Sequence, residues 1–311
     1  MHRFLLHNDE VRDAGDLIVS PGQLGLLNGW GVFSTLRVYS GVMFQWERHW
    51  ARMQRDAIRM RVPFPEDPVW LEQRLHRLIE ANQAWNATLR VVIARNRGGA
   101  WLKMWEGPAA SREFDAIAFT ADVNHWGRDQ KKPADKAVRL GLVPNARHAA
   151  NEFAGAKVLS WSQNLTWFER AHEQGFDEVV LLNERGEVAE CTSANIFAAN
   201  LDDRGNARVW TPPLSSGCLP GVTRALLLED VRIAGVQVAE KTLMPTDLEA
   251  ADEVFITSTT RELLPVASVD GLNLGLKRRQ SPGEVRVALQ TAFTEHVRAY
   301  VATRLSVPAG P

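Results

Sequence analysis

Apolar residues recur along this chain in two different rhythms, and each rhythm predicts one kind of secondary structure. Short stretches alternate apolar and polar residues or are rich in Val, Ile and Phe, which is typical of β-strands. Two longer stretches, residues 44–62 and 69–82, repeat their apolar residues three or four positions apart, which predicts amphipathic helices. Strands are predicted over residues 3–7, 17–19, 32–39, 89–95, 115–123, 137–143, 187–192 and 253–257.

The second half of the chain predicts further helices. One contains Trp161, Leu165 and Phe168 at helical spacing and ends at Gly175, and we expect these large side chains in the core. The others are predicted to begin after the glycine-containing loop 214–221, at a capping box over residues 246–249, and at a Ser-Pro pair at 281–282.

A polar stretch divides the chain into two parts. Residues 124–135 are charged and polar and are interrupted by Gly and Pro, which is typical of a linker. We therefore predict a smaller N-terminal α/β domain over residues 1–123 and a larger C-terminal α/β domain over residues 136–311. A chain of 311 residues is long enough for two such domains, each with its own core.

Composition and charge narrow the classes of function. The chain is 45% hydrophobic and 23% charged, as in ordinary globular proteins, and its formal net charge is −1. Such a chain has no basic field to attract nucleic acid or an anionic membrane, so we expect neither as a partner. With only Cys191 and Cys218, it has no disulfide framework and no zinc spacing. It shows no signal segment and no apolar run of membrane-spanning length, so we expect a cytoplasmic protein.

The first candidate for chemistry is Lys157. Lysine is scarce in this chain, because only seven of the 36 basic residues are Lys. Lys157 lies in the apolar segment Ala-Gly-Ala-Lys-Val-Leu, where desolvation would lower its pKa and favour the neutral amine. A neutral amine is what a Schiff-base lysine needs to attack an aldehyde. The alternative is a surface lysine whose stem covers small residues.

The second candidate is Glu190, which lies in an alternating segment after the turn 183–186. A carboxylate on such a strand can simply face solvent. It can also pair with the ring nitrogen of pyridoxal phosphate and keep it protonated, so that the ring draws electrons from the substrate.

Four motifs in a fixed order resemble the class IV aminotransferases. Lys157 precedes a predicted helix, and three motifs follow it: Asp177-Glu-Val-Val-Leu-Leu-Asn183, Glu190-Cys-Thr-Ser-Ala-Asn-Ile-Phe197 and Thr211-Pro-Pro-Leu-Ser-Ser-Gly-Cys-Leu-Pro-Gly-Val-Thr-Arg224. The family contains the fold-type IV enzymes that use pyridoxal 5'-phosphate: branched-chain aminotransferase, D-amino-acid aminotransferase and 4-amino-4-deoxychorismate lyase. The resemblance covers nearly the whole chain. It implies an α/β (α+β) fold of two domains with the cofactor in the interdomain cleft, and a homodimer.

By this resemblance, Arg52, Val222, Thr223 and Thr259 bind the cofactor together with Lys157 and Glu190. Arg52 matches the second arginine of the family segment Arg-x-His-x-x-Arg-Leu, which holds the phosphate through charge-assisted hydrogen bonds. The amides of Val222 and Thr223 begin a helix, where unpaired amides favour an anion. Without the resemblance these features are ordinary, because other arginines crowd the same helix and glycine-rich helix starts are common.

The resemblance also assigns residues to the substrate. Phe33 and Thr35 match the segment that lines the family's substrate pocket, and the sequence Phe-Ser-Thr favours the lyase pattern over the Phe-Glu-Gly of branched-chain enzymes. Arg95 or Arg97 would meet a substrate carboxylate, although either can be a solvated turn residue. Thr260 is assigned to the substrate carboxylate as well.

Four hypotheses about function are considered. Transamination of a small amino acid, branched-chain ones included, ranks first because the segment 211–224 looks most like branched-chain enzymes. Aminodeoxychorismate lyase ranks second because of Phe-Ser-Thr and the turn 95–99. D-amino-acid transamination ranks below these two. A cofactor-binding protein without turnover is disfavoured by the intact Lys157 and Glu190.

Overall fold

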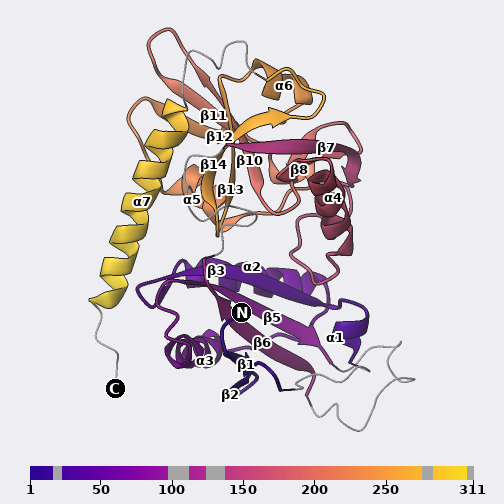
Figure 1. Cartoon of the computed structure of the whole chain (residues 1–311), viewed down its shortest axis with the longest axis vertical. Helices are drawn as coiled ribbons and strands as arrows, with labels where there is room; N and C mark the ends of the chain where they lie inside the picture. The colour runs from indigo at the N-terminus through magenta and orange to yellow at the C-terminus, as the bar shows by residue number, and fades with distance from the viewer. Residues whose placement is uncertain (17–22, 97–111, 124–136, 275–282, 307–311) are drawn as a thin grey trace. The chain divides into compact units, whose positions relative to one another are not determined.

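The computed structural model describes residues 1–16, 23–96, 112–123, 137–274 and 283–306, and the chain forms two compact units (Figure 1). The first unit comprises Met1–Asn124, Ala156–Trp161 and Tyr300–Pro311, and the second comprises His125–Gly155 and Ser162–Ala299. The segment that carries Lys157 thus belongs to the first unit. The predicted linker 124–135 lies outside the described residues, and the predicted domain division stays a prediction.

An antiparallel sheet forms the centre of the first unit. Its strand order is β2-β1-β6-β5-β3-β4. The strands are β1 (Phe4–His7), β2 (Glu10–Asp13), β3 (Gly31–Tyr39), β4 (Val42–Met43), β5 (Ala87–Arg95) and β6 (Phe114–Ala121). Four of the predicted strands correspond to β1, β3, β5 and β6, while the one at 17–19 lies outside the described residues. Strand β2 was not predicted, and it pairs with β1 across a turn that includes Asn8 at φ 55°.

Three helices accompany this sheet: α1 (Leu24–Leu27), α2 (Trp46–Arg59) and α3 (Pro68–Ala81). Helix α2 is shorter than predicted, because Gln45 before it and Arg61 after it adopt left-handed backbone conformations. Helix α3 begins where the Asp67 carboxylate accepts a hydrogen bond from the Val69 amide, with a proline at the first helical position. Helix α2 buries the predicted apolar stripe of Trp46, Trp50, Met53 and Ala57, and α3 buries that of Leu71, Leu75, Leu78 and Ile79. Trp70 on α3, also predicted to face inward, is only partly buried and packs against the core.

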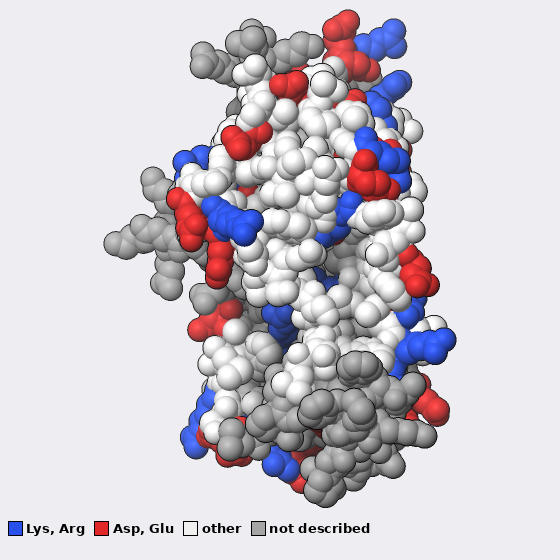
Figure 2. Space-filling model, turned by 90° about the vertical axis from the view of Figure 1, so that its right-hand side faces the viewer, with Lys and Arg blue, Asp and Glu red and all other residues white. Residues whose placement is uncertain are grey.

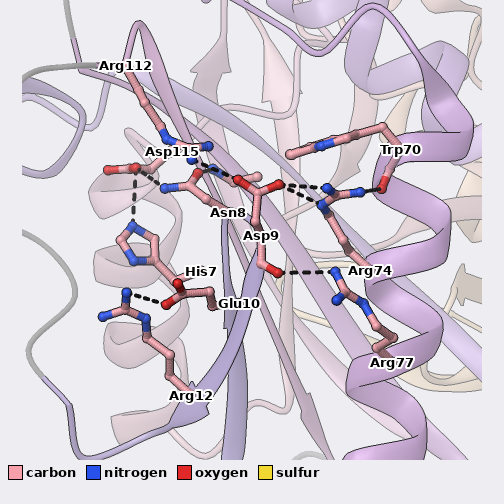
Figure 3. Close-up of polar contacts among 11 residues, drawn as sticks. His7, Asn8, Asp9, Glu10, Arg12, Trp70, Arg74, Arg77, Arg112 and Asp115 are labelled. Atoms are coloured by element: carbon pink, nitrogen blue, oxygen red, sulfur yellow. Dashed lines mark hydrogen bonds and ion pairs between the residues drawn. The ribbon is translucent and has the colours of Figure 1, made fainter.

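Ion pairs fix the β1–β2 turn to helix α3 (Figure 3). Asp9 accepts two hydrogen bonds from Arg74, at 3.0 and 2.6 Å, and one from Arg112 at 2.7 Å. The hydrogen bonds from Arg112 and Arg74 lower the pKa of Asp9. Arg77 adds a hydrogen bond to the Asp9 carbonyl at 3.1 Å. These side chains are partly exposed, so the cluster anchors a turn and adds little to the stability of the core.

A mixed sheet forms the centre of the second unit. Its strand order is β12-β11-β10-β13-β14-β7-β8-β9, and the β11–β12, β14–β7 and β7–β8 pairs are parallel. The strands are β7 (Val138–Arg147), β8 (Glu178–Asn183), β9 (Val188–Cys191), β10 (Asn195–Leu201), β11 (Ala207–Thr211), β12 (Val236–Glu240), β13 (Glu253–Ser258) and β14 (Glu262–Val269). Strand β8 is buried along its whole length, so its apolar run lies in the middle of the core.

The helices beginning in the second unit are α4 (Ser162–Glu173), α5 (Val222–Glu229), α6 (Pro245–Ala250) and α7 (Glu284–Leu305), with a short 3₁₀ turn η2 (Leu214–Ser216). Two predictions about them are wrong. Leu165 on α4 is 47% exposed, and the helix buries Asn164 and Ala171 instead. Helix α6 is capped by the Asp247 carboxylate, which accepts from the Met244 amide at 2.8 Å, and not by the predicted box 246–249. The Ser-Pro pair at 281–282 lies outside the described residues.

Charge is mixed on the molecular surface. Figure 2 shows acidic and basic side chains interspersed on the face that it presents. In the described ranges, no helix combines the length and the apolar character needed to cross a bilayer. Nor do three or more His, Cys, Asp or Glu side chains of those ranges gather where a metal ion could bind.

Candidate active site

Lys157 lies in a short segment that pairs with the beginning of strand β3. The Phe33 amide donates to the Lys157 carbonyl at 3.1 Å, and the Leu159 amide donates to the Gly31 carbonyl at 2.9 Å. The Lys157 amide donates to the buried Asp56 carboxylate at 3.0 Å. Backbone bonds on both sides therefore fix the position from which the lysine side chain extends.

The Lys157 amine contacts an aromatic ring that an arginine also contacts. Its Nζ atom is 4.6 Å from the centre of the Phe33 ring, and the Arg90 guanidinium carbon is 4.2 Å from the same centre. Both contacts have cation–π geometry. Strand register places Arg90 directly opposite Thr35 on β3. Phe33, Thr35, Arg90 and Lys157 thus form one group in the first unit.

No carboxylate among the described residues pairs with Arg90. Burial lowers the pKa of Arg90, yet a guanidinium stays charged at neutral pH. A partly buried cation without an internal counter-ion is suited to an anionic ligand. Arg90 was missed by the sequence reasoning, although an arginine within the apolar strand Leu-Arg-Val-Val-Ile is an unusual residue that could have indicated it.

Arg95 lies at the end of the same strand in different surroundings. Its guanidinium carbon is 4.2 Å from the centre of the Trp30 ring, and it donates to the Arg61 carbonyl. Its predicted contact with a substrate carboxylate stays a prediction. The neighbouring candidate Arg97, together with the rest of the predicted turn to residue 99, lies outside the described residues.

Arg52 takes part in a buried hydrogen-bonded group with Ser34 and His49. Arg52 donates to the Ser34 hydroxyl at 2.8 Å, and the Ser34 hydroxyl lies 2.7 Å from His49 Nδ1. With its oxygen accepting from Arg52, the hydroxyl donates to Nδ1, which places the imidazole proton on Nε2. Burial, and then the charges of Arg52 and Lys157, hold the pKa of His49 well below 6.5, so this imidazole is neutral.

The Arg52 side chain remains a cation in this setting. Burial lowers the pKa of Arg52 to about 10, while the nearby Asp56 carboxylate opposes that shift. At neutral pH the guanidinium is charged and almost fully buried, which suits the predicted contact with a phosphate.

In the second unit, Glu190 lies near the end of strand β9 and is only 8% exposed. Its carboxylate accepts a hydrogen bond from Arg147 Nε at 3.1 Å and one from the Leu219 amide at 3.0 Å. Arg147 in turn donates to the Asn164 side chain at 3.2 Å. These two hydrogen bonds hold the carboxylate in one orientation.

Arg147 reaches Glu190 because strand β7 is irregular near its end. The register of β7 against β8 shifts between Val143 and Arg147, and Asn145 adopts a left-handed conformation at φ 52°. Asparagine tolerates this conformation better than most residues, and such irregularities turn side chains toward functional sites. Arg147 was not among the predicted site residues, because its partner is 43 positions away in the sequence.

Asn195 connects Glu190 to the start of helix α5. Its side-chain amide donates to the Leu219 carbonyl at 2.9 Å, and a methyl group built on Gly221 would lie 2.1 Å from its oxygen. A larger residue at position 221 would therefore displace the Asn195 side chain, which the chain passes closely here. Gly221 provides no side chain to cap α5, and no side chain of the described residues caps it. The amides of Val222 and Thr223 therefore keep the anion-binding character of a helix start.

Thr259 and Thr260 lie in the short loop between β13 and β14. Ser258 pairs with Glu262 across this loop, and Glu262 has a left-handed backbone at φ 50°. Asn195 pairs with Thr257 on β13, so the same asparagine lies next to this loop and next to the start of α5. The predicted phosphate-binding residues of the second unit therefore gather around Asn195, which the sequence reasoning missed as a site residue.

The cysteines of this region are inert. Cys191 and Cys218 are both buried. Desolvation raises the pKa of Cys218 to about 12 and that of Cys191 well above its ordinary value. Both therefore stay protonated thiols that pack in the core.

Comparison with known proteins identifies the family. The model of the family amino-transferase class IV matches residues 31–269, which is more than half of the chain. The chain belongs to the class IV aminotransferases and is an enzyme of that family. The predicted family is thereby confirmed.

Relatives with different substrates match almost the whole chain. A D-alanine aminotransferase of Bacillus licheniformis is 27% identical over 94% of this chain and 96% of its own length. A putative branched-chain-amino-acid aminotransferase of Methanocaldococcus jannaschii is 28% identical over 93% and 94%. Because their names give different substrates, these relatives leave the substrate of this chain open.

Solved structures confirm the predicted fold class. The Escherichia coli branched-chain amino acid aminotransferase matches with a TM-score of 0.80 at 26% identity, covering 95% of this chain and 94% of that one. A hypothetical aminotransferase from Mycobacterium tuberculosis in its PLP-bound form matches with a TM-score of 0.75 at 25% identity, covering 93% and 98%. The chain has the fold of the fold-type IV aminotransferases.

Proposed function

We propose that this enzyme transfers the amino group of a small amino acid to a 2-oxo acid, with Lys157 as the catalytic residue. The proposal rests on the group around Phe33. The Lys157 amine and the Arg90 guanidinium both contact the Phe33 ring, and no carboxylate of the described residues pairs with Arg90. An amine for covalent chemistry and a cation for a carboxylate are what an amino acid substrate requires.

Class IV aminotransferases use pyridoxal 5'-phosphate, and this chain uses the same cofactor. The residues present fit it. Glu190, held by Arg147 and the Leu219 amide, can pair with the ring nitrogen and keep it protonated. The uncapped start of α5 and the Thr223 hydroxyl offer donors to the phosphate. When bound, the cofactor supplies an aldehyde and a ring that takes up the electron pair of the substrate α-carbon.

The roles of the chain's own residues follow from their positions. Lys157 would hold the cofactor through its amine, and the same amine, when free, would move the α-proton of the substrate as base and as acid. Arg90 binds a carboxylate of the substrate next to Phe33 and Thr35. Arg52, Thr223 and Thr259 bind the phosphate. Thr260 and Arg95 remain proposed contacts of the substrate carboxylate.

Absorbance spectroscopy of the purified holoenzyme tests the proposal. Mixing with a panel of L- and D-amino acids should convert the lysine-bound form of the cofactor into its amine form, and the amino acid that does so names the donor and its configuration. An unchanged spectrum, with pyruvate released from 4-amino-4-deoxychorismate, would instead make the chain a lyase, the alternative that Phe33-Ser34-Thr35 favours.

Lys157→Ala should lose the protein–cofactor bond that borohydride makes permanent. Lys241→Ala is a matched control, because Lys241 is an exposed lysine paired with Asp247 at 2.9 Å. The control should still form the adduct that borohydride makes permanent. If Lys157→Ala forms this adduct as readily as Lys241→Ala does, Lys157 is not the catalytic residue.

We also propose a homodimer, on the basis of the family resemblance alone, and a cytoplasmic location, as the sequence leads us to expect. Sedimentation of the holoenzyme measures the oligomeric state directly.

A further inference from the structure

The side chain of Arg261 connects three segments of the second unit. Its Nη2 atom donates to Ser193 Oγ at 2.6 Å and to Glu178 Oε2 at 3.0 Å. Its Nε atom lies 3.2 Å from Ser258 Oγ, which also accepts from the Arg261 amide at 3.3 Å. Arg261 therefore ties its own loop, between β13 and β14, to the start of β8 and to the turn between β9 and β10.

Glu178, the anionic partner of Arg261, is completely buried. Its carboxylate also accepts hydrogen bonds from the Ser193 hydroxyl at 2.5 Å, from the Val179 amide at 3.0 Å, and from the Thr192 hydroxyl. Within the described part of the chain, the one cation paired with this carboxylate is Arg261. A buried carboxylate requires such a partner, so Arg261 is held in place and this contact does not depend on a ligand.

The loop that Arg261 holds contains Thr259 and Thr260. Glu262 closes this loop in a left-handed conformation at φ 50°, which is uncommon for a residue other than glycine. Such a conformation persists where surrounding contacts impose it. Here Gln290 of α7 donates to the Glu262 carboxylate at 2.6 Å, and Arg261 fixes the other side of the loop.

We propose that Arg261, oriented by Glu178, is a positioning residue that shapes the Thr259–Thr260 loop for the phosphate of the cofactor. This inference rests on the proposed function, which places that phosphate at Thr259. Arg261 acts through the loop: its Nε atom and amide hold Ser258, and the loop amides then face the anion. The Ser193 contact extends the same support to the turn that leads into Asn195.

The test compares two ligands that differ in the phosphate alone. Dissociation constants of pyridoxal phosphate and of pyridoxal are measured for the wild type, Arg261→Lys and Ser258→Ala. Arg261→Lys keeps a cation opposite Glu178 but lacks the fork that reaches Ser258 as well, so it tests the loop without leaving a buried charge unpaired. Ser258→Ala removes the acceptor on the loop side.

Each variant should weaken pyridoxal phosphate binding about tenfold. A loop that Arg261 no longer holds should lose the equivalent of one hydrogen bond to the charged phosphate. The affinity for pyridoxal should change less than about twofold, because the ring and lysine contacts are untouched. Arg208→Ala, the loss of an exposed arginine on β11, is the control and should change neither constant.

Equal weakening of the binding of both ligands would overturn the inference, because it would indicate a general loss of structure. Unchanged binding of both ligands would overturn it as well, because Arg261 would then have no effect on the phosphate site. Failure of the wild type to bind pyridoxal phosphate at Lys157 would overturn the proposed function instead, and this inference with it.

Discussion

Arg147 holds the carboxylate that is proposed to control the cofactor ring, so replacing it should affect stability and turnover together. Arg147→Ala removes the hydrogen bond to Glu190 at 3.1 Å and the one to Asn164 at 3.2 Å. Glu190 would keep the Leu219 amide at 3.0 Å as a donor but would lose its charged partner.

The magnitude follows from the burial of the pair. Breaking a fully buried ion pair costs about 3–5 kcal/mol, whereas an exposed pair is worth less than about 1 kcal/mol. The side chains of Arg147 and Glu190 are 19% and 10% exposed, so water reaches them only in part. We expect Arg147→Ala to lower the free energy of unfolding by about 2–3 kcal/mol, and the melting temperature by about 5–10 °C.

Turnover should fall further than stability alone explains. A carboxylate that is free to rotate away from the ring nitrogen would no longer keep it protonated, and a displacement of about 1 Å at a reacting group can reduce a rate about a hundredfold. Arg147→Lys should give an intermediate rate, because a single ammonium cannot serve both Glu190 and Asn164 as the guanidinium does.

The assay combines thermal unfolding of the holoenzyme with steady-state turnover. Arg139→Ala is the matched control on the same strand, since its side chain is 57% exposed and lies 3.8 Å from Asp177. It should change the unfolding free energy by less than about 0.5 kcal/mol. If Arg147→Ala has the same melting temperature and the same kcat as Arg139→Ala, then Arg147 does not orient Glu190.

Two further predictions concern the first unit. Arg90→Met should raise KM for the amino acid substrate at least about tenfold, through loss of a charge-assisted bond to its carboxylate, whereas Arg95→Met should do so only if the sequence-based assignment is right. Equal KM values for Arg90→Met and the wild type would exclude Arg90 from substrate binding. His49→Gln should flatten the pH dependence of stability, because Gln does not titrate and can still accept from Ser34. The pKa of His49 is lowered in the folded state, so the unfolded chain takes up the proton first and stability is lost as the pH falls below 6.5. Between pH 6.5 and 5 the wild type should therefore lose more stability than His49→Gln, by at most about 2 kcal/mol, the limit for an imidazole that stays neutral in the folded state. Denaturant unfolding measures both curves, and parallel curves would contradict a neutral His49.

Local pattern was sufficient for most elements of the fold and for the family. The buried stripes of α2 and α3 follow from apolar residues three or four positions apart, since a helix brings such residues to one face. The order of the motifs around Lys157 and Glu190 indicated the family because each motif is a continuous segment that can be read without its neighbours. Leu165 is an exception on helix α4. Its spacing is helical, but spacing alone does not decide which face of a helix meets the core.

The sequence by itself determined the class of enzyme and the candidate residues Lys157 and Glu190, because both depend on residue type within a short segment. Tertiary structure decided their partners. Arg90 lies beside Phe33 because the register of β3 and β5 sets it opposite Thr35. Arg147 meets Glu190 through an irregularity near the end of β7. Arg261 finds Glu178 across 83 positions of sequence. Alternation along a strand shows which face a side chain occupies, whereas the strand pairing that forms in the folded chain determines its neighbour.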